Sequence, residues 1–150
     1  MPENAELIKL YSARILALAS EIPHHGRLDA PQASVKRRAP LCGSTVTVDL
    51  DLQDGRVTRF AQDVKACALG QASAALLGQV VLGRSIAQLT QARDQLRAML
   101  RDDGPVPDAP FDGFEVLTPA REYRNRHASI LLALEATTDA CAQLAGENTG

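Results

Sequence analysis

Apolar and polar residues alternate strictly in one stretch of the chain, from Thr45 to Leu52. The apolar positions are Val46, Val48, Leu50 and Leu52, and the polar positions are Thr45, Thr47, Asp49 and Asp51. Successive side chains of a β-strand point to opposite faces of the sheet. The pattern therefore predicts a strand with one buried side and one solvent-facing side.

A second strand is expected to return beside the first. Asp54-Gly55 is a typical two-residue hairpin turn, and the apolar residues of Arg56 to Val64 continue after it. Val57 and Phe60 are out of phase by one residue, which predicts a β-bulge. A third strand, at an edge of the sheet, is expected within the polar segment from Ala33 to Arg38.

Helices are expected in the remaining chain, and each has a recognisable start or end. The expected helices are Ala5–Glu21, Ala68–Leu82, Ile86–Arg101 with Ser85 as its cap, and one from Pro119 to about Ala145, capped by Thr118 and broken near Asn125. Gly70 and Gly78 interrupt the second helix and predict close packing against a neighbouring backbone, because glycine otherwise weakens a helix. A loop from Asp102 to Val116 is expected to be anchored by Phe111 and Phe114.

The order of these elements predicts an α+β fold. A small three-stranded antiparallel sheet would carry the N-terminal helix and the C-terminal helices on one face. The chain has 150 residues, enough for one domain with its own core, so residues 1–150 are read as a single domain.

The composition of the chain argues against some classes of function. The net charge of −2 and the 3% aromatic content, with no Trp, argue against a nucleic-acid-binding module. No apolar run reaches the roughly 18–20 residues that span a bilayer, and no signal peptide is recognisable. We therefore expect a cytoplasmic protein, without a membrane or nucleic-acid partner, whose three cysteines are reduced.

Two cysteines flank the predicted hairpin. Cys42 precedes the first strand in a turn that Gly43 permits, and Cys67 stands where a helix begins. Amides at the helix start would lower the pKa of the Cys67 thiol. Because both cysteines lie at the same end of the hairpin, they suggest a soft-metal or sulfur site. The alternative is that both are buried core residues, as free cysteines often are.

Longer motifs surround these cysteines: Tyr11-Ser12, Pro23 to Leu28, Pro40-Leu41-Cys42-Gly43, the turn at Gly55, Cys67-Ala68-Leu69-Gly70-Gln71-Ala72-Ser73, and Arg124 to Leu131. In this order they resemble the motifs of the NifU N-terminal (IscU/SufU) iron-sulfur scaffold family. The resemblance covers nearly the whole chain, and the ordered combination is more specific than any single piece.

The resemblance implies an IscU-like fold and a site of three cysteines plus Asp or His. Such a site receives sulfur from a cysteine desulfurase, assembles a transient [2Fe-2S] cluster or binds Zn²⁺, and passes the cluster to acceptor apoproteins. It is a scaffold and not an enzyme with turnover. This sequence departs from the family in two places. Ser44 stands where the family has aspartate, and the third cysteine is replaced by Ala128 or, in a register shifted by one residue, by His127.

The ligand set implied by this comparison is Cys42, Cys67 and His127, with Ser44 as a weak fourth candidate. Cys141 lies 14 residues beyond His127 (141 minus 127), about 21 Å along a continuous helix, and is therefore assigned to the core. Arg124 and Arg126 would attract anionic sulfide, although they are equally compatible with ordinary solvated helix positions. A monomer is favoured.

Two alternatives to cluster assembly remain open at this point. One is a zinc-binding or sulfur-trafficking relative that has lost cluster assembly together with its third cysteine. The other is a metal-free interaction module on the same fold. Its binding surface would be the basic run Lys36 to Arg38, which otherwise reads as a charged strand edge that deters aggregation.

Overall fold

The computed structural model describes residues 12–40 and 43–149, with side chains as far as Ala145. The strands β1 (Ala33–Arg38), β2 (Thr45–Gln53) and β3 (Arg56–Lys65) form one antiparallel sheet in that order. The helices are α2 (Ala13–Ser20), α3 (Ala68–Val80), α4 (Ile86–Arg101), the 3₁₀ helix η1 (Asp112–Glu122) and α5 (Arg124–Thr149). The predicted α+β architecture is confirmed.

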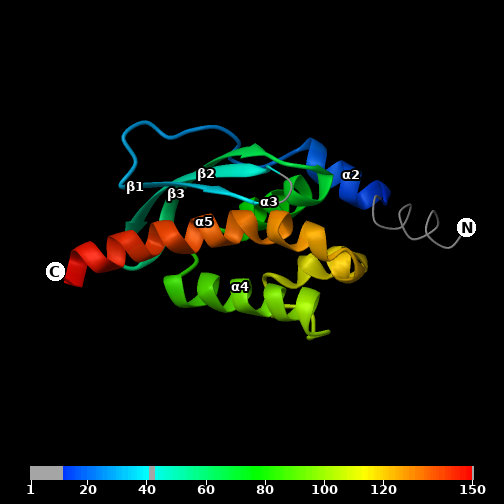
Figure 1. The fold of residues 1–150 in the computed structure, drawn as a ribbon. Coiled ribbons are helices and arrows are strands. Elements are labelled where there is room, and N and C mark those ends of the chain that lie inside the picture. The colour runs from blue at the N-terminus through cyan, green and yellow to red at the C-terminus, as the bar shows by residue number, and fades with distance from the viewer. Residues whose placement is uncertain (1–11, 41–42, 150) are drawn as a thin grey trace, which may run out of the picture.

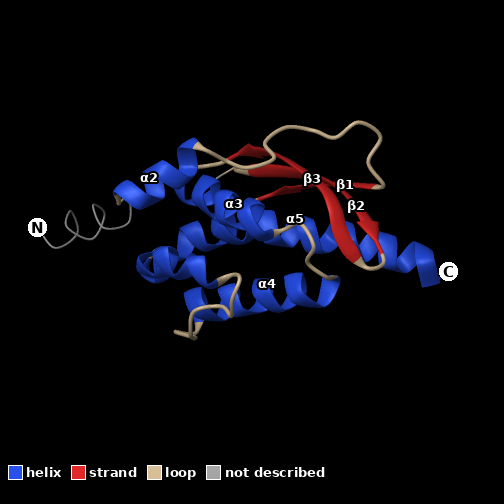
Figure 2. Cartoon of the chain, turned by 180° about the vertical axis from the view of Figure 1, so that it is seen from behind, coloured by secondary structure: helices blue, strands red, loops and turns tan. Residues whose placement is uncertain are grey.

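Helices α3, α4 and α5 are layered on one face of the sheet, and α2 packs against α3 beyond the end of the strands (Figure 1). The long helix α5 runs across this face, and α4 lies on the side of α5 away from the strands. Figure 2 shows the same order from behind, with α3 beside α5. None of the helices within residues 12–40 and 43–149 is long and apolar enough to cross a membrane.

The hairpin forms as its sequence predicts. Asp54 and Gly55 both have positive φ angles, 54° and 77°, the conformation of a type I′ turn. The pairing shifts between Asp51 and Leu52: Asp51 pairs with Arg59 and Leu52 with Val57, so Thr58 is the extra residue of a bulge. Because of this bulge, Val57 and Phe60 both face the helices. The β-bulge predicted from their spacing is confirmed.

The core lies between the sheet and the helices. Val46, Val48 and Leu50 of β2 are at most 2% exposed and face α5, whose buried residues include Ile130 and Leu134. Phe111 and Phe114 are buried and stacked with their ring centres 6.5 Å apart, which confirms that they anchor the segment after α4. Cys141 is completely buried, in agreement with its assignment to the core.

Two helix predictions differ from the structure. Only Ala13–Ser20 of the predicted first helix is helical among the described residues, and its residues 5–11 lie outside them. The predicted loop to Val116 and helix start at Thr118-Pro119 were wrong, because one 3₁₀ helix spans Asp112–Glu122. Thr118 donates its hydroxyl hydrogen to the carbonyl of Glu115 (2.7 Å) instead of capping a helix, and α5 begins only after Tyr123.

The outer face of the sheet is only partly open to solvent. Asp49 was expected to face water, but its side chain is completely buried beneath the segment that connects α2 to β1. Its carboxylate accepts hydrogen bonds from Arg27 Nε (2.7 Å), the Leu28 amide (3.0 Å) and the Ser34 hydroxyl (2.6 Å). The expectation was wrong because this long connection folds back over one half of the sheet.

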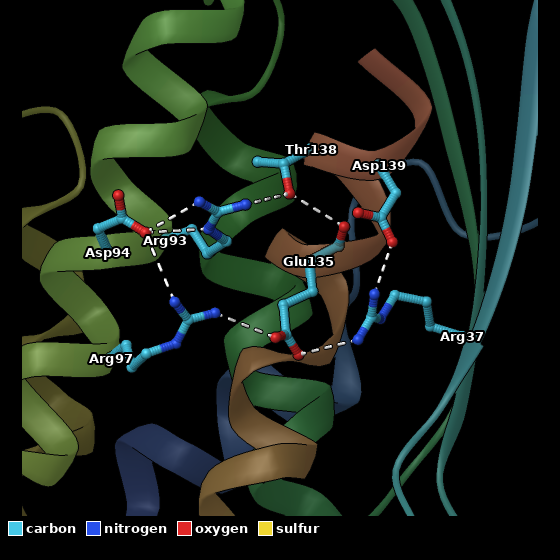
Figure 3. Close-up of polar contacts among 7 residues, drawn as sticks. All are labelled: Arg37, Arg93, Asp94, Arg97, Glu135, Thr138 and Asp139. Carbon is cyan, nitrogen blue, oxygen red and sulfur yellow. Dashed lines mark hydrogen bonds and ion pairs between the residues drawn. The ribbon is translucent and has the colours of Figure 1, made fainter. Parts of the chain in front are cut away.

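Charged side chains also tie the layers together (Figure 3). Arg37 of β1 forms an ion pair with Asp139 of α5 (2.6 Å) and lies 3.9 Å from Glu135. Glu135 in turn pairs with Arg97 of α4 at 3.2 Å. Arg37 therefore differs from Lys36 and Arg38, because its guanidinium is engaged by α5, and the interpretation of Lys36 to Arg38 as a docking patch stays a prediction.

Candidate functional site

The candidate site is built where the start of α3 meets α5. Cys67 is the residue that precedes α3, with an extended backbone (φ −68°, ψ 170°), and its side chain is half-buried. Its sulfur lies 3.6 Å from the hydroxyl oxygen of Ser129, a residue of the first turns of α5. The Ser129 hydroxyl oxygen is also 3.1 Å from that of Ser44, in the turn before β2. The three side chains thus meet although they are far apart in the sequence.

Gly70 permits this approach of α3 to α5. A Cβ atom at position 70 would lie 2.6 Å from the Ser129 hydroxyl oxygen and 2.8 Å from the Ala66 Cβ. Three residues later, the Ser73 hydroxyl donates a hydrogen bond to the Ile130 carbonyl (2.6 Å), which fixes the two helices in this register. At Gly78 a Cβ would lie 3.0 Å from the Pro23 carbonyl oxygen. The prediction that these glycines mark close packing is confirmed.

The surroundings of Cys67 favour its ionised form. Burial by itself would raise the pKa of the thiol, but the amides of Gly70 and Leu69, the Ser129 hydroxyl and the Arg126 guanidinium together bring the pKa below its ordinary value. These amides belong to the first turn of α3, where helix N–H groups have no partner within the helix. The sequence-based expectation of a lowered Cys67 pKa is confirmed.

Cys67 and Cys141 are expected to differ strongly in reactivity. Burial raises the pKa of Cys141 to about 11, whereas that of Cys67 is lowered. Since the thiolate is the reactive form, iodoacetamide should alkylate Cys67 at least about tenfold faster at pH 7. Peptide mass spectrometry would measure this directly, because Lys65, Arg84 and Arg126 allow trypsin to separate the two cysteines. Equal alkylation rates for the two cysteines would contradict the prediction. In Ser129→Ala, the pH dependence of Cys67 alkylation should move to higher pH.

His127 occupies a different position from the one proposed for a ligand. Its side chain is buried, and Nε2 lies 2.9 Å from the Ala120 carbonyl oxygen and 3.0 Å from that of Arg121. Carbonyl oxygens only accept hydrogen bonds, so Nε2 carries a hydrogen and is directed at η1. In the described part of the chain, His127 forms no hydrogen bond with Cys67 or Ser44. If His127 binds a metal ion, it must do so through Nδ1. The role of His127 as a ligand stays a prediction.

The described side chains form an incomplete metal site by themselves. Within residues 12–40 and 43–145, no three His, Cys, Asp or Glu side chains are grouped so that they could hold a metal ion. Cys42 lies outside the described residues, two positions before Ser44. The structure describes one partly exposed thiol whose pKa is lowered, with the hydroxyl groups of Ser129 and Ser44 and the Arg126 guanidinium around it. This set can hold a sulfur atom or supply one thiolate ligand.

Ser129 is the site residue that the sequence reasoning missed. It follows Ala128, the position at which the family resemblance places a third cysteine, and its own side chain carries no metal-binding signal. The only available signal was its place within the segment Arg124 to Leu131. Ser44, a weak candidate from the sequence, is 4% exposed and contacts Ser129, so its hydroxyl does reach the site.

Known proteins resemble this chain over most of its length. The sequence model of the NifU-like N terminal domain matches residues 10–115. The iron-sulfur cluster assembly scaffold protein IscU of Thermotoga maritima is 22% identical over 131 residues, which cover 87% of this chain and 92% of that protein. The protein of the same name from Streptococcus pyogenes serotype M1 is 22% identical over 136 residues, covering 91% and 85% of the two chains.

Solved structures agree with this relationship. The N-terminal NifU-like protein from Brucella abortus is 41% identical and superimposes with a TM-score of 0.92, covering 94% of this chain and 98% of that one. A putative iron-sulfur cluster assembly scaffold protein for the SUF system, from Fervidobacterium islandicum AW-1, shares the fold with a TM-score of 0.79 at 17% identity, covering 89% and 98%. The chain therefore belongs to the family of NifU-like N-terminal domains.

Proposed function

We propose that this protein is a cytoplasmic scaffold for iron-sulfur cluster assembly. It binds iron and sulfide as cargo, holds a transient [2Fe-2S] cluster and passes it to acceptor apoproteins, with a cysteine desulfurase as the source of sulfur. It acts stoichiometrically and not as an enzyme with turnover. The observation that carries the proposal is the position of the half-buried Cys67 thiol at the start of α3, 3.6 Å from the Ser129 hydroxyl, where its pKa is lowered.

This thiol has the properties that a temporary ligand requires. A thiolate binds iron and iron-sulfur clusters directly, and a lowered pKa increases the thiolate fraction at neutral pH. Partial exposure leaves room for cargo to arrive and depart. Hydroxyl and guanidinium groups near the sulfur stabilise negative charge there. We propose Cys42 as the second thiolate ligand, because it precedes Ser44 by two residues and Ser44 lies in the site.

Besides Cys42 and Cys67, the bound iron needs further ligands. In this proposal Ser129 would hydrogen-bond to sulfur at Cys67, Ser44 would support Ser129, and His127 would contribute only through Nδ1, since its Nε2 faces two carbonyl groups. The replacement of the family's third cysteine by Ala128 favours a second candidate function, a zinc-binding or sulfur-trafficking relative. Such a protein would need fewer thiolates than a scaffold that holds a cluster.

Anaerobic reconstitution with Fe²⁺ and sulfide tests the proposal. We expect a visible sulfur-to-iron charge-transfer absorption, and we expect Cys67→Ala and Cys42→Ala to reduce it to about a tenth or less, because each removes a thiolate ligand. Cys141→Ala is the matched control, since this thiol is completely buried in the core, and it should retain the spectrum. Stoichiometric zinc without a cluster would identify the second candidate. Protein that binds neither metal would contradict both and favour a metal-free interaction module.

A further inference from the structure

Basic side chains gather on the outer face of the sheet, at the end that leads into the site. Residues paired directly across an antiparallel ladder point to the same face. Thr45 of β2 pairs with Arg38 on one side and with Lys65 on the other, so these three share the outer face. Lys36 pairs with Thr47 and is on the same face, one step further along β2. We call Lys36, Arg38 and Lys65 the basic row.

The basic row is close to the proposed cargo site. Lys65 is the last residue of β3 and precedes Cys67 by two positions. Arg38 is the last residue of β1, on the strand that runs toward the turn before Ser44. Neighbouring strands lie about 4.8 Å apart, so the backbones of Arg38 and Lys65 are about 10 Å apart, on either side of Thr45. The row therefore borders the edge at which cargo would enter.

Charge on this face is distributed unequally. Toward the hairpin turn, Arg27 pairs with Asp49 and Arg59 pairs with Asp51, so these two cations are neutralised, whereas Arg56 donates a hydrogen bond to the Gly83 carbonyl. All three members of the basic row are exposed, and none forms an ion pair with another described residue. Among the described residues of the three strands, Asp63, which pairs with Thr47, is the one acidic residue on this half of the face. The half-face beside Cys67 thus has a local charge of about +2 in a chain whose net charge is −2.

We propose that the basic row docks an acidic surface of the protein that donates sulfur to Cys67. This inference rests on the proposed scaffold function and adds the location and the chemistry of the docking surface. Opposite charges at the rim of an interface accelerate association and orient the partners. An acidic surface held at the basic row places the donor beside the start of α3, where Cys67 is half-buried. Nucleic acid fits the row poorly, because three cations without neighbouring aromatic side chains offer no stacking surface.

Charge reversal tests the docking surface. The probe is the cysteine desulfurase encoded in the same genome, and its affinity for the intact chain is measured at 50 and 200 mM NaCl. Lys36→Glu/Arg38→Glu/Lys65→Glu is expected to weaken binding at least about tenfold at 50 mM, mainly through slower association, and to remove most of the salt dependence. Arg101→Glu is the matched control. It changes an exposed basic residue in the last turn of α4, outside the sheet, and should leave affinity unchanged.

The binding measurements test the docking surface, and a second measurement tests the scaffold function. Unchanged affinity in the triple variant would overturn it, and so would an equal loss in Arg101→Glu or the absence of binding in the unmodified protein. Circular dichroism and cluster reconstitution on the same variant provide the second readout. The triple variant should remain folded and should form the cluster when Fe²⁺ and sulfide are supplied chemically. If the unmodified protein formed no cluster from Fe²⁺ and sulfide, the scaffold function itself would be contradicted.

Discussion

Replacing Gly70 by alanine is expected to destabilise the protein and to disrupt the Cys67 site. The added Cβ would meet the Ser129 hydroxyl oxygen at 2.6 Å and the Ala66 Cβ at 2.8 Å. The Ser129 hydroxyl is hydrogen-bonded to that of Ser44, and the Ala66 Cβ is fixed to the backbone just before α3, so neither atom can give way without displacing its surroundings. Overpacking of this kind costs about 1–3 kcal/mol, more than the gain of about 1 kcal/mol from replacing glycine in a helix.

Urea denaturation and cysteine reactivity measure the two consequences. We expect the free energy of unfolding of Gly70→Ala to fall by about 1–2 kcal/mol, and the pKa of Cys67 to rise as Ser129 moves away. Gly78→Ala is the comparison, since the atoms nearest to its added Cβ would be the Gln62 side-chain nitrogen and the Pro23 carbonyl oxygen, both at 3.0 Å and not 2.6 Å, so its effect should be smaller. Ser129→Ala in the Gly70→Ala background should recover part of the loss. An unchanged or increased stability of Gly70→Ala would refute the close-packing argument.

Elements specified by nearby residues were predictable from the sequence. The type I′ turn at Asp54-Gly55 follows from two residues that tolerate positive φ, and the bulge follows from one change of apolar phase. The start of α4 is equally local, because Ser85 and Gln88 form a capping box within four residues. The position of Cys67 before α3 belongs to the same group, and with it the direction of its pKa shift.

Features that depend on distant segments were not predictable in this way. Asp49 fits a solvent-facing position of an alternating strand, and only the connection around Arg27 buries it. Ser129 becomes part of the site only because Gly70 lets two helices approach. His127 is directed at η1, a 3₁₀ helix whose extent the local signals at Thr118 do not reveal. In each of these three cases the residue type is compatible with several roles, and a tertiary contact determines which one it has.

Substitution of Asp49 by alanine is expected to destabilise the protein by about 2–3 kcal/mol at pH 7, because it leaves the Leu28 amide and the Ser34 hydroxyl without their acceptor. Burial would raise the pKa of the Asp49 carboxyl, but hydrogen bonds from Arg27, Ser34 and Leu28, with the charge of Arg27, bring it below its ordinary value. A carboxyl whose pKa is lowered by folding stabilises the native state above its unfolded pKa, near 4. That stabilisation is lost as pH falls through the lower, folded pKa.

Comparison with Asp49→Asn isolates this charge, because the amide preserves the shape of the side chain and one acceptor oxygen. Urea denaturation between pH 7 and pH 2.5 should show a stability difference between wild type and Asp49→Asn that is constant above about pH 5 and shrinks below pH 4. Asp54→Asn, an exposed carboxyl in the hairpin turn that Asn also tolerates, should show little difference at any pH. A difference for Asp49→Asn that persisted unchanged to pH 2.5 would mean that the Arg27 pair is not what stabilises this half of the sheet. The connection over the outer face would then depend on its backbone contacts, such as that from Gly26 to Gln62 (2.8 Å).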